Sequence, residues 1–188
     1  MIKWGILGLG NMANHFAKAV KVLDNAKLVG VASKSQIKLI KFSKDYDISK
    51  NYTFNNYKDL IESNSIDSIY ISTLNNTHND LILKCIKNNK NILCEKPMCV
   101  NVDDAKIIYE KLKHSSIFFN EAIAYRSHPQ TIELLKLINE NEIGKIKKIE
   151  SSFGFKVRKI NKKSRLFNPK LGGGAILDLG CYPISFFQ

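Results

Sequence analysis

The chain has few cysteines, no long apolar run and no leader-like N-terminus. Its four cysteines among 188 residues are too sparse for a disulfide-stabilised scaffold. They form no C-x-x-C pair and have no histidine at ligand spacing, so we expect no metal site. No apolar run approaches the roughly 20 residues that a membrane-spanning helix needs. Because the apolar stretch of a secretory signal is also missing, we expect no membrane association and a cytoplasmic location.

Arginine is scarce as well. Arg126, Arg158 and Arg165 are the only arginines, and lysines supply most of the positive charge behind the formal net charge of +12. Nucleic-acid-binding proteins usually concentrate their charge and use arginine for bidentate contacts. The lysines here are spread along the chain, so we expect a solvated basic surface and no nucleic-acid partner, with a polyanion partner as the alternative. A positive field favours a phosphorylated cofactor.

Hydrophobic residues make up 44% of the chain, which excludes a disordered protein. Apolar runs that predict buried strands alternate with segments of helical spacing. Strands are predicted over residues 2–7, 27–32, 52–54, 68–72, 91–94 and 116–120. Helices are predicted over residues 12–23, 36–46, 79–86 and 102–112, with a short one through Leu60 and Ile61. This alternation predicts βαβ units, so we assign residues 1–120 to an α/β domain with a doubly wound parallel sheet.

The pattern changes in residues 121–188. A helix is predicted from Pro129 through Ile138, followed by a long strand over residues 145–157 and a final helix over residues 175–187. A single strand is not stable alone, because about three strands or a packed partner are needed. We therefore expect residues 121–188 to begin a second domain that this chain does not complete.

Gly8, Gly10 and Ala13 match the pattern G-x-G-x-x-A between the first predicted strand and the first predicted helix. This context indicates a dinucleotide-binding loop. Gly8 permits the tight turn, Gly10 lets the backbone approach a pyrophosphate, and Ala13 allows close packing. The phosphates are expected at the positive end of the helix. Asn11 and Met12 lie within the loop, and we expect both to contact the cofactor.

The second predicted strand ends without an acidic residue. Ser33, Lys34 and Ser35 stand where an aspartate or glutamate would hold the ribose 2′-hydroxyl of NAD. A lysine flanked by hydroxyls suits a 2′-phosphate, so we predict NADP as the cofactor, with NAD as the alternative. Ser33 and Lys34 are the expected contacts, although Lys34 is also compatible with an ordinary surface lysine.

Two further segments follow the fourth and fifth predicted strands, at the edge where ligands bind in open α/β folds. For Asn75 and His78, cofactor contact and helix capping are equally open. Lys96 stands beside a proline and is expected to face the nicotinamide end of the cofactor. The cofactor contacts expected from these segments are Thr73, Asn75, His78, Glu95, Lys96 and Pro97.

Asp178 and Tyr182 lie four residues apart in the final predicted helix, so we expect both to project from one face. Hydride transfer requires a proton to move on the substrate oxygen, and an adjacent ammonium lowers the tyrosine pKa from about 10. Lys96 and Tyr182 are therefore the candidate proton-transfer pair, and Asp178 is expected to orient the substrate or Lys96. A buried tyrosine with a satisfied hydroxyl is the alternative for Tyr182.

Together these segments resemble the Gfo/Idh/MocA family of oxidoreductases. The resemblance extends over Gly8–Ala13, Thr73–His78, Glu95–Pro97, Glu121–Pro129 and Gly172–Pro183. It implies an N-terminal Rossmann domain and a C-terminal α/β domain with a large, mostly antiparallel sheet that commonly forms the oligomer interface. The family's usual proline after the threonine of the fourth-strand motif is replaced here by Leu74.

The resemblance also implies catalytic roles for Lys96, Asp178 and Tyr182. Tyrosine instead of histidine at position 182 is similar to the glucose–fructose oxidoreductase and dihydrodiol dehydrogenase branch, which favours NADP. The implied function is an NADP-dependent oxidoreductase that transfers a hydride to or from a sugar, polyol or related secondary alcohol. Members are nearly twice as long, so we expect a C-terminally truncated chain whose full-length form is a homo-oligomer. A non-catalytic NAD(P)-binding regulator and an inactive remnant are the alternatives.

Overall fold

The computed structural model describes residues 1–188, which divide into two compact units, Met1–Glu121 and Ala122–Gln188. No helix in it has the length and apolar character needed to cross a membrane. The strands of the first unit are β1 (Ile2–Leu7), β2 (Ala26–Ala32), β3 (Thr53–Phe54), β4 (Ser68–Ile71), β5 (Asn91–Glu95) and β6 (Phe119–Ala122). Its helices are α1 (Asn11–Lys21), α2 (Gln36–Asp45), α3 (Tyr57–Glu62), α4 (His78–Lys87) and α5 (Val102–Lys113).

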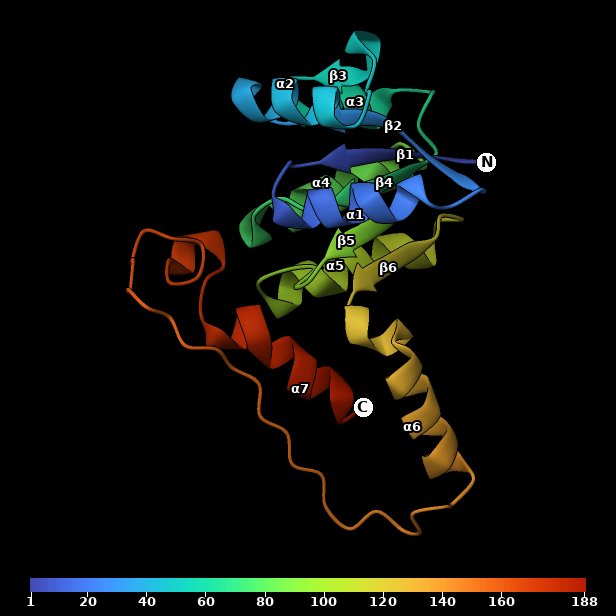
Figure 1. Cartoon of the computed structure of the whole chain (residues 1–188), viewed down its shortest axis with the longest axis vertical. Helices are drawn as coiled ribbons and strands as arrows, with labels where there is room; N and C mark the ends of the chain where they lie inside the picture. Colours follow the sequence, from blue (N-terminus) through green and yellow to red (C-terminus); the bar gives the residue numbers. More distant parts are fainter. The chain divides into compact units, whose positions relative to one another are not determined.

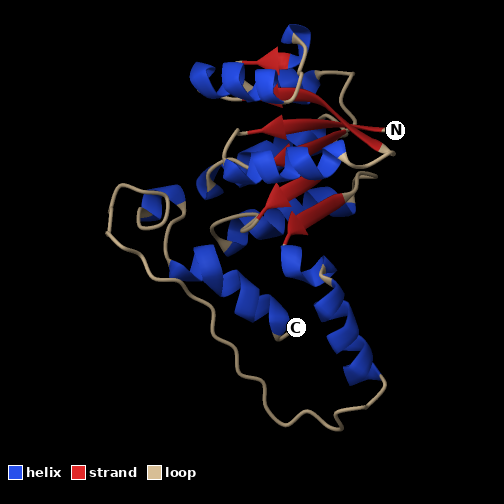
Figure 2. Cartoon of the chain, in the orientation of Figure 1, coloured by secondary structure: helices blue, strands red, loops and turns tan.

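The six strands form one sheet in the order β3-β2-β1-β4-β5-β6. β1 pairs in parallel with β2 and β4, and the β2–β3 and β4–β5 pairs are parallel too. The strand arrows in Figure 2 accordingly run in one direction. The strand order reverses between β1 and β4, which is where ligands bind in such folds, beyond the carboxyl ends of the strands. The predicted doubly wound α/β class is confirmed.

Helices cover both faces of this sheet (Figure 1). Successive strand residues point to opposite faces, so neighbours such as Ile6 and Leu7 enter different cores. Ile6 packs with buried residues of α1 and α2, including Ala13 and Leu39. Leu7 belongs to the core that contains Ile108 of α5. Burial on both sides explains why the strands are nearly continuous apolar runs and not alternating patterns.

Predicted element boundaries differ from the observed ones by a few residues. The sixth strand shows the largest shift, since it was predicted over residues 116–120 and begins only at Phe119. The side chain of Asn91 accepts a hydrogen bond from the Phe118 N–H at 2.8 Å, while the Phe118 carbonyl accepts one from Ile92. A side-chain contact of this kind takes the place of a ladder bond, and no periodicity signals it.

The second unit contains helix α6 (Pro129–Asn139), a π-helical turn over Ile176–Gly180 and helix α7 (Cys181–Phe186), with 3-10 turns at Ala124–Ser127 and Pro169–Leu171. The strand predicted over residues 145–157 is not formed, so that prediction is wrong. Its apolar residues, including Ile149 and Phe155, are exposed. A strand forms only against a partner, and residues 123–188 contain no other strand. The mostly antiparallel sheet stays a prediction for a longer chain.

Candidate functional site

The turn between β1 and α1 requires glycine at position 8. Gly8 has a φ of 85°, and a Cβ there would lie 2.9 Å from the Ser72 carbonyl oxygen. The turn is held on both sides, because the Gly8 N–H donates to the Ala32 carbonyl at 2.9 Å and the Ser72 hydroxyl donates to the Gly8 carbonyl at 2.8 Å. Gly8 is therefore required by the protein's own packing between β2 and β4.

Gly10 lies in a different environment from Gly8. A Cβ at Gly10 would meet no atom within 4 Å, so the protein leaves open space there. Gly10 is the N-cap of α1, which has neither a side-chain cap nor an acidic residue in its first turn. Asn14 donates to the Gly10 carbonyl at 2.9 Å and orients the loop. An uncapped helix N-terminus beside open space fits an anionic group such as the pyrophosphate of a dinucleotide.

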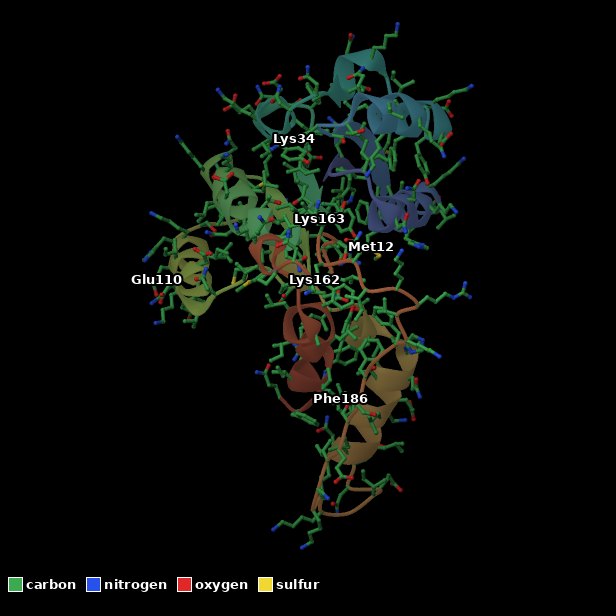
Figure 3. The ribbon with its side chains drawn as sticks, turned by 90° about the vertical axis from the view of Figure 1, so that its left-hand side faces the viewer. Met12, Lys34, Glu110, Lys162, Lys163 and Phe186 are labelled. Atoms are coloured by element: carbon green, nitrogen blue, oxygen red, sulfur yellow. The ribbon has the colours of Figure 1, made fainter.

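Lys34 stands just beyond the carboxyl end of β2. Its Nζ lies 5.8 Å from the centre of the Tyr57 ring, which restrains an otherwise exposed cation. The flanking hydroxyls have local partners, since Ser33 accepts from the Ser35 N–H at 3.1 Å and Ser35 caps α2. Lys34 and Met12, both labelled in Figure 3, thus belong to the same sheet edge, after β2 and at the start of α1.

His78 is the first residue of α4 and is fully buried. Its Nδ1 lies 2.8 Å from the Pro97 carbonyl and its Nε2 lies 3.4 Å from the Thr73 carbonyl. Both carbonyls can only accept, and the shorter distance favours the tautomer that carries its proton on Nδ1. His78 therefore links the loop after β4 to the loop after β5, a role that was not considered in the sequence analysis. Direct cofactor contact by His78 stays a prediction.

The burial of His78 predicts a pH-dependent stability. Burial lowers the pKa of His78 in the folded chain, with the two carbonyls opposing the shift. The unfolded chain then binds the proton more tightly, so stability falls as the pH drops below about 6.5. Urea unfolding at about pH 7 and pH 5 measures the change. The variant His78→Gln should show a smaller loss over the same interval, and an equal loss would contradict the prediction.

The segment that follows β5 is held from two sides. The Tyr70 hydroxyl donates to Glu95 Oε1 at 2.5 Å, and the Met98 N–H donates to Glu121 Oε1 at 2.8 Å. Lys96 lies between these two anchors, is partly buried and precedes a cis peptide bond to Pro97. Tyr70 and Glu121 were not identified as site residues from the sequence. The signal for Tyr70 is its single polar atom in an otherwise apolar part of β4.

Cys85 and Cys94, in α4 and β5, are fully buried. Burial raises the pKa of the Cys85 thiol to about 12, so it stays protonated at neutral pH. Burial likewise raises the pKa of Cys94, which directly precedes Glu95. These thiols belong to the packing beneath the site and not to its chemistry.

Asp178 of the second unit forms an ion pair with Arg165, a pairing that was not predicted from the sequence. Arg165 Nη1 lies 3.3 Å from Asp178 Oδ1, and the Asp178 side chain is only 14% exposed. Nearby in the chain, the backbone passes too close to position 173 for a side chain, because a Cβ at Gly173 would lie 2.6 Å from the Arg165 carbonyl oxygen. Asp178 lies in a π turn and Tyr182 in the following α-helix, so regular α-helical spacing does not hold between them. π turns often occur at functional sites.

Tyr182 lines a cavity of about 360 Å³ within the second unit. Its ring lies 5.2 Å from the Phe153 ring, edge to face, and 6.3 Å from the Tyr125 ring. The lining residues are Tyr125, Ser151, Ser152, Phe153, Tyr182, Pro183 and Phe186. The Ser185 hydroxyl donates to the Tyr182 carbonyl at 2.9 Å and lies 2.8 Å from the Tyr125 hydroxyl. Aromatic side chains and a few polar groups thus line an open depression beside Tyr182.

The predicted cofactor contacts thus lie along one sheet edge of the first unit, at the carboxyl ends of β1, β2, β4 and β5. The predicted proton-transfer residues divide between the units, with Lys96 in the first and Asp178 and Tyr182 in the second.

Comparisons with known proteins show what the chain is similar to. The chain is 33% identical over 186 residues to trans-1,2-dihydrobenzene-1,2-diol dehydrogenase of Xenopus tropicalis, covering 98% of this chain and 55% of that protein. It is 29% identical to the D-xylose 1-dehydrogenase (NADP(+)) of Hypocrea jecorina, covering 98% and 52%. The chain therefore spans about half the length of these curated relatives.

Among solved structures, a 3-ketoreductase from Actinomadura kijaniata in complex with TDP-benzene and NADP has a TM-score of 0.82 at 20% identity. That match covers 97% of this chain and 55% of the other, and it shows the shared fold.

Two family models match consecutive parts of the chain. Residues 131–188 match the GFO/IDH/MocA C-terminal domain. Residues 2–122 match the model described as "oxidoreductase family, NAD-binding Rossmann fold". Since this second match covers the whole sheet and the glycine loop that opens α1, the chain belongs to the Gfo/Idh/MocA oxidoreductase family.

Proposed function

We propose that this chain carries the cofactor site and the proton-transfer residues of an NADP-dependent oxidoreductase that acts on sugars, polyols or cyclic diols. The observation that carries the proposal is the loop from Gly8 to Gly10, which opens α1 onto uncapped amides and open space. The relatives support it, because those compared above are a diol dehydrogenase and an NADP-dependent xylose dehydrogenase.

The strand order supports a proposed position for each part of NADP. Lys34 after β2 would hold the adenosine 2′-phosphate, and the amides at the start of α1, near Gly10, would hold the pyrophosphate. The nicotinamide half would then lie over the ends of β4 and β5, beside Thr73 and Lys96. NADP, when bound, supplies hydride exchange with the substrate carbon.

The chain's own residues would move the proton. Lys96 lies on a partly buried segment after β5 and would take part in this proton transfer. Tyr182 would exchange the proton on the substrate oxygen as general acid or base. Asp178, held by Arg165 at 3.3 Å, would orient the substrate or Lys96. A homo-oligomeric full-length form and a cytoplasmic location stay predictions.

Cofactor titration tests the proposal. We expect NADPH to bind at least about tenfold more tightly than NADH, a difference of about 1.4 kcal/mol. The variant Lys34→Ala should lose this preference while NADH affinity stays the same, because only the 2′-phosphate contact is removed. Cofactor fluorescence measures both affinities.

Lys38→Ala is the matched control, since Lys38 is another exposed lysine in the first turn of α2. It should leave both affinities unchanged. Binding of neither cofactor to the wild-type chain would contradict the proposed function. Equal losses of NADPH affinity in Lys34→Ala and Lys38→Ala would indicate a general effect of positive surface charge. That result would contradict only the role of Lys34.

A further inference from the structure

Tyr70 is an unusual residue in the middle of β4. It is only 2% exposed, and its ring stacks on Phe16 of α1 with centres 4.2 Å apart. Phe16 in turn contacts Trp4 at 5.0 Å, edge to face. A buried tyrosine needs a partner for its hydroxyl, and here that partner is a carboxylate, Glu95 Oε1 at 2.5 Å.

The direction of this hydrogen bond is fixed. Burial and the neighbouring Glu95 raise the pKa of Tyr70, so the phenol keeps its proton and donates. Glu95 accepts with one oxygen, and a carboxylate has further acceptor positions on the other. The rigid stack on Phe16 holds the donor in place, so the bond also fixes the orientation of the Glu95 carboxylate.

Glu95 occupies a particular position on the sheet edge. It is the last residue of β5 and directly precedes Lys96. If Lys34 binds the adenosine end and Gly10 the pyrophosphate, as proposed above, the strand order leaves the nicotinamide riboside half of the dinucleotide for the β5 edge. The ribose hydroxyls of that half are hydrogen-bond donors that suit a carboxylate oxygen.

We propose that Tyr70 is a positioning residue whose hydroxyl holds the Glu95 carboxylate so that its other oxygen accepts a hydrogen bond from a ribose hydroxyl of the nicotinamide half. The inference rests on the proposed function only in requiring that a dinucleotide binds this edge. It assigns to a buried core tyrosine a selective effect on one half of the cofactor.

Binding of two ligands can distinguish an effect on the nicotinamide half of the cofactor from an effect on the adenosine half. NADP⁺ carries both, whereas adenosine 2′,5′-bisphosphate carries only the adenosine half. The variant Tyr70→Phe removes one oxygen and keeps the aromatic stack. It should weaken NADP⁺ binding about tenfold and leave the affinity for adenosine 2′,5′-bisphosphate unchanged, as measured by isothermal titration calorimetry. A purely structural role would change both affinities together, and unchanged NADP⁺ affinity would overturn the proposal.

Tyr46→Phe is the matched control. The Tyr46 hydroxyl donates toward the Asn14 carbonyl at 3.2 Å and Oδ1 at 3.1 Å, and Asn14 contacts Gly10. Loss of that hydroxyl acts near the pyrophosphate, so it should not separate the two ligands as Tyr70→Phe does. Trp4 is the single tryptophan, and an unchanged emission spectrum in Tyr70→Phe verifies that the Phe16 stack is intact.

A second pair of variants tests whether Tyr70 acts through Glu95. Glu95→Gln should weaken NADP⁺ binding, and adding Tyr70→Phe to it should have little further effect. Additive losses would overturn the positioning role. If the wild-type chain bound neither ligand, the proposed function would fail together with this inference. If it bound both and Tyr70→Phe did not discriminate between them, only this inference would fail.

Discussion

Replacing Gly10 with alanine should abolish dinucleotide binding while leaving the fold intact. The new methyl group would enter open space, and Gly10 has a φ of −97°, which alanine adopts readily. Stability should therefore change by no more than about 1 kcal/mol, the usual effect at an N-cap. The methyl would occupy the volume through which the backbone approaches the pyrophosphate, so NADPH affinity should fall at least about 100-fold.

Gly8→Ala, in contrast to Gly10→Ala, should destabilise the fold itself. A φ of 85° and a Cβ only 2.9 Å from the Ser72 carbonyl make alanine strained in the protein itself. We expect a loss on the order of 3 kcal/mol in the free energy of unfolding. Denaturant unfolding and NADPH titration of both variants measure the contrast. Retained NADPH binding in Gly10→Ala would show that the pyrophosphate does not approach this loop.

Removing the proposed proton-transfer groups should have the second large effect. Lys96→Ala and Tyr182→Phe should each lower turnover of a sugar or diol at least about 100-fold while NADPH still binds. Tyr182→Phe keeps the ring that contacts Phe153 at 5.2 Å, so only the hydroxyl is lost. The measurement is NADPH absorbance with a panel of sugars, polyols and cyclic diols.

Tyr109→Phe is the control for this experiment, because Tyr109 is exposed on α5 and is not one of the proposed site residues. It should leave turnover unchanged. Retained turnover in both Lys96→Ala and Tyr182→Phe would contradict the assignment of these two residues to proton transfer. A wild-type chain that binds NADPH and turns over no substrate would favour the regulator or remnant alternatives.

The sheet and the glycine loop were predictable because their signals are local. The four central strands β1, β2, β4 and β5 are short, largely apolar runs, and the longer helices repeat their apolar residues along one face. Gly8 and Gly10 stand in a pattern whose meaning depends only on the strand before and the helix after. The prediction of a strand over residues 145–157 was wrong because a strand also depends on a partner that is not local in the sequence. Alternation indicates which face of a strand is buried, but a partner strand is needed for it to form.

The residues that orient the site were not predictable, because their partners are distant in sequence. Tyr70 and Glu95 lie on neighbouring strands, and the parallel register brings the Tyr70 hydroxyl to the end of β5. His78 bonds to Pro97 across two loops, and neither residue type indicates the other. Arg165 pairs with Asp178, thirteen residues further along the chain.

The sequence by itself therefore determined the α/β class, the position of the dinucleotide loop and the candidate proton-transfer residues. Periodicity and turn chemistry act over a few neighbouring residues, so they can be recognised from the sequence. Only the tertiary structure decided what holds those residues in place: the Tyr70–Glu95 hydrogen bond, the buried His78 and the Arg165–Asp178 pair. Such contacts arise when packing excludes water and each buried polar atom must find a partner, wherever in the sequence that partner lies.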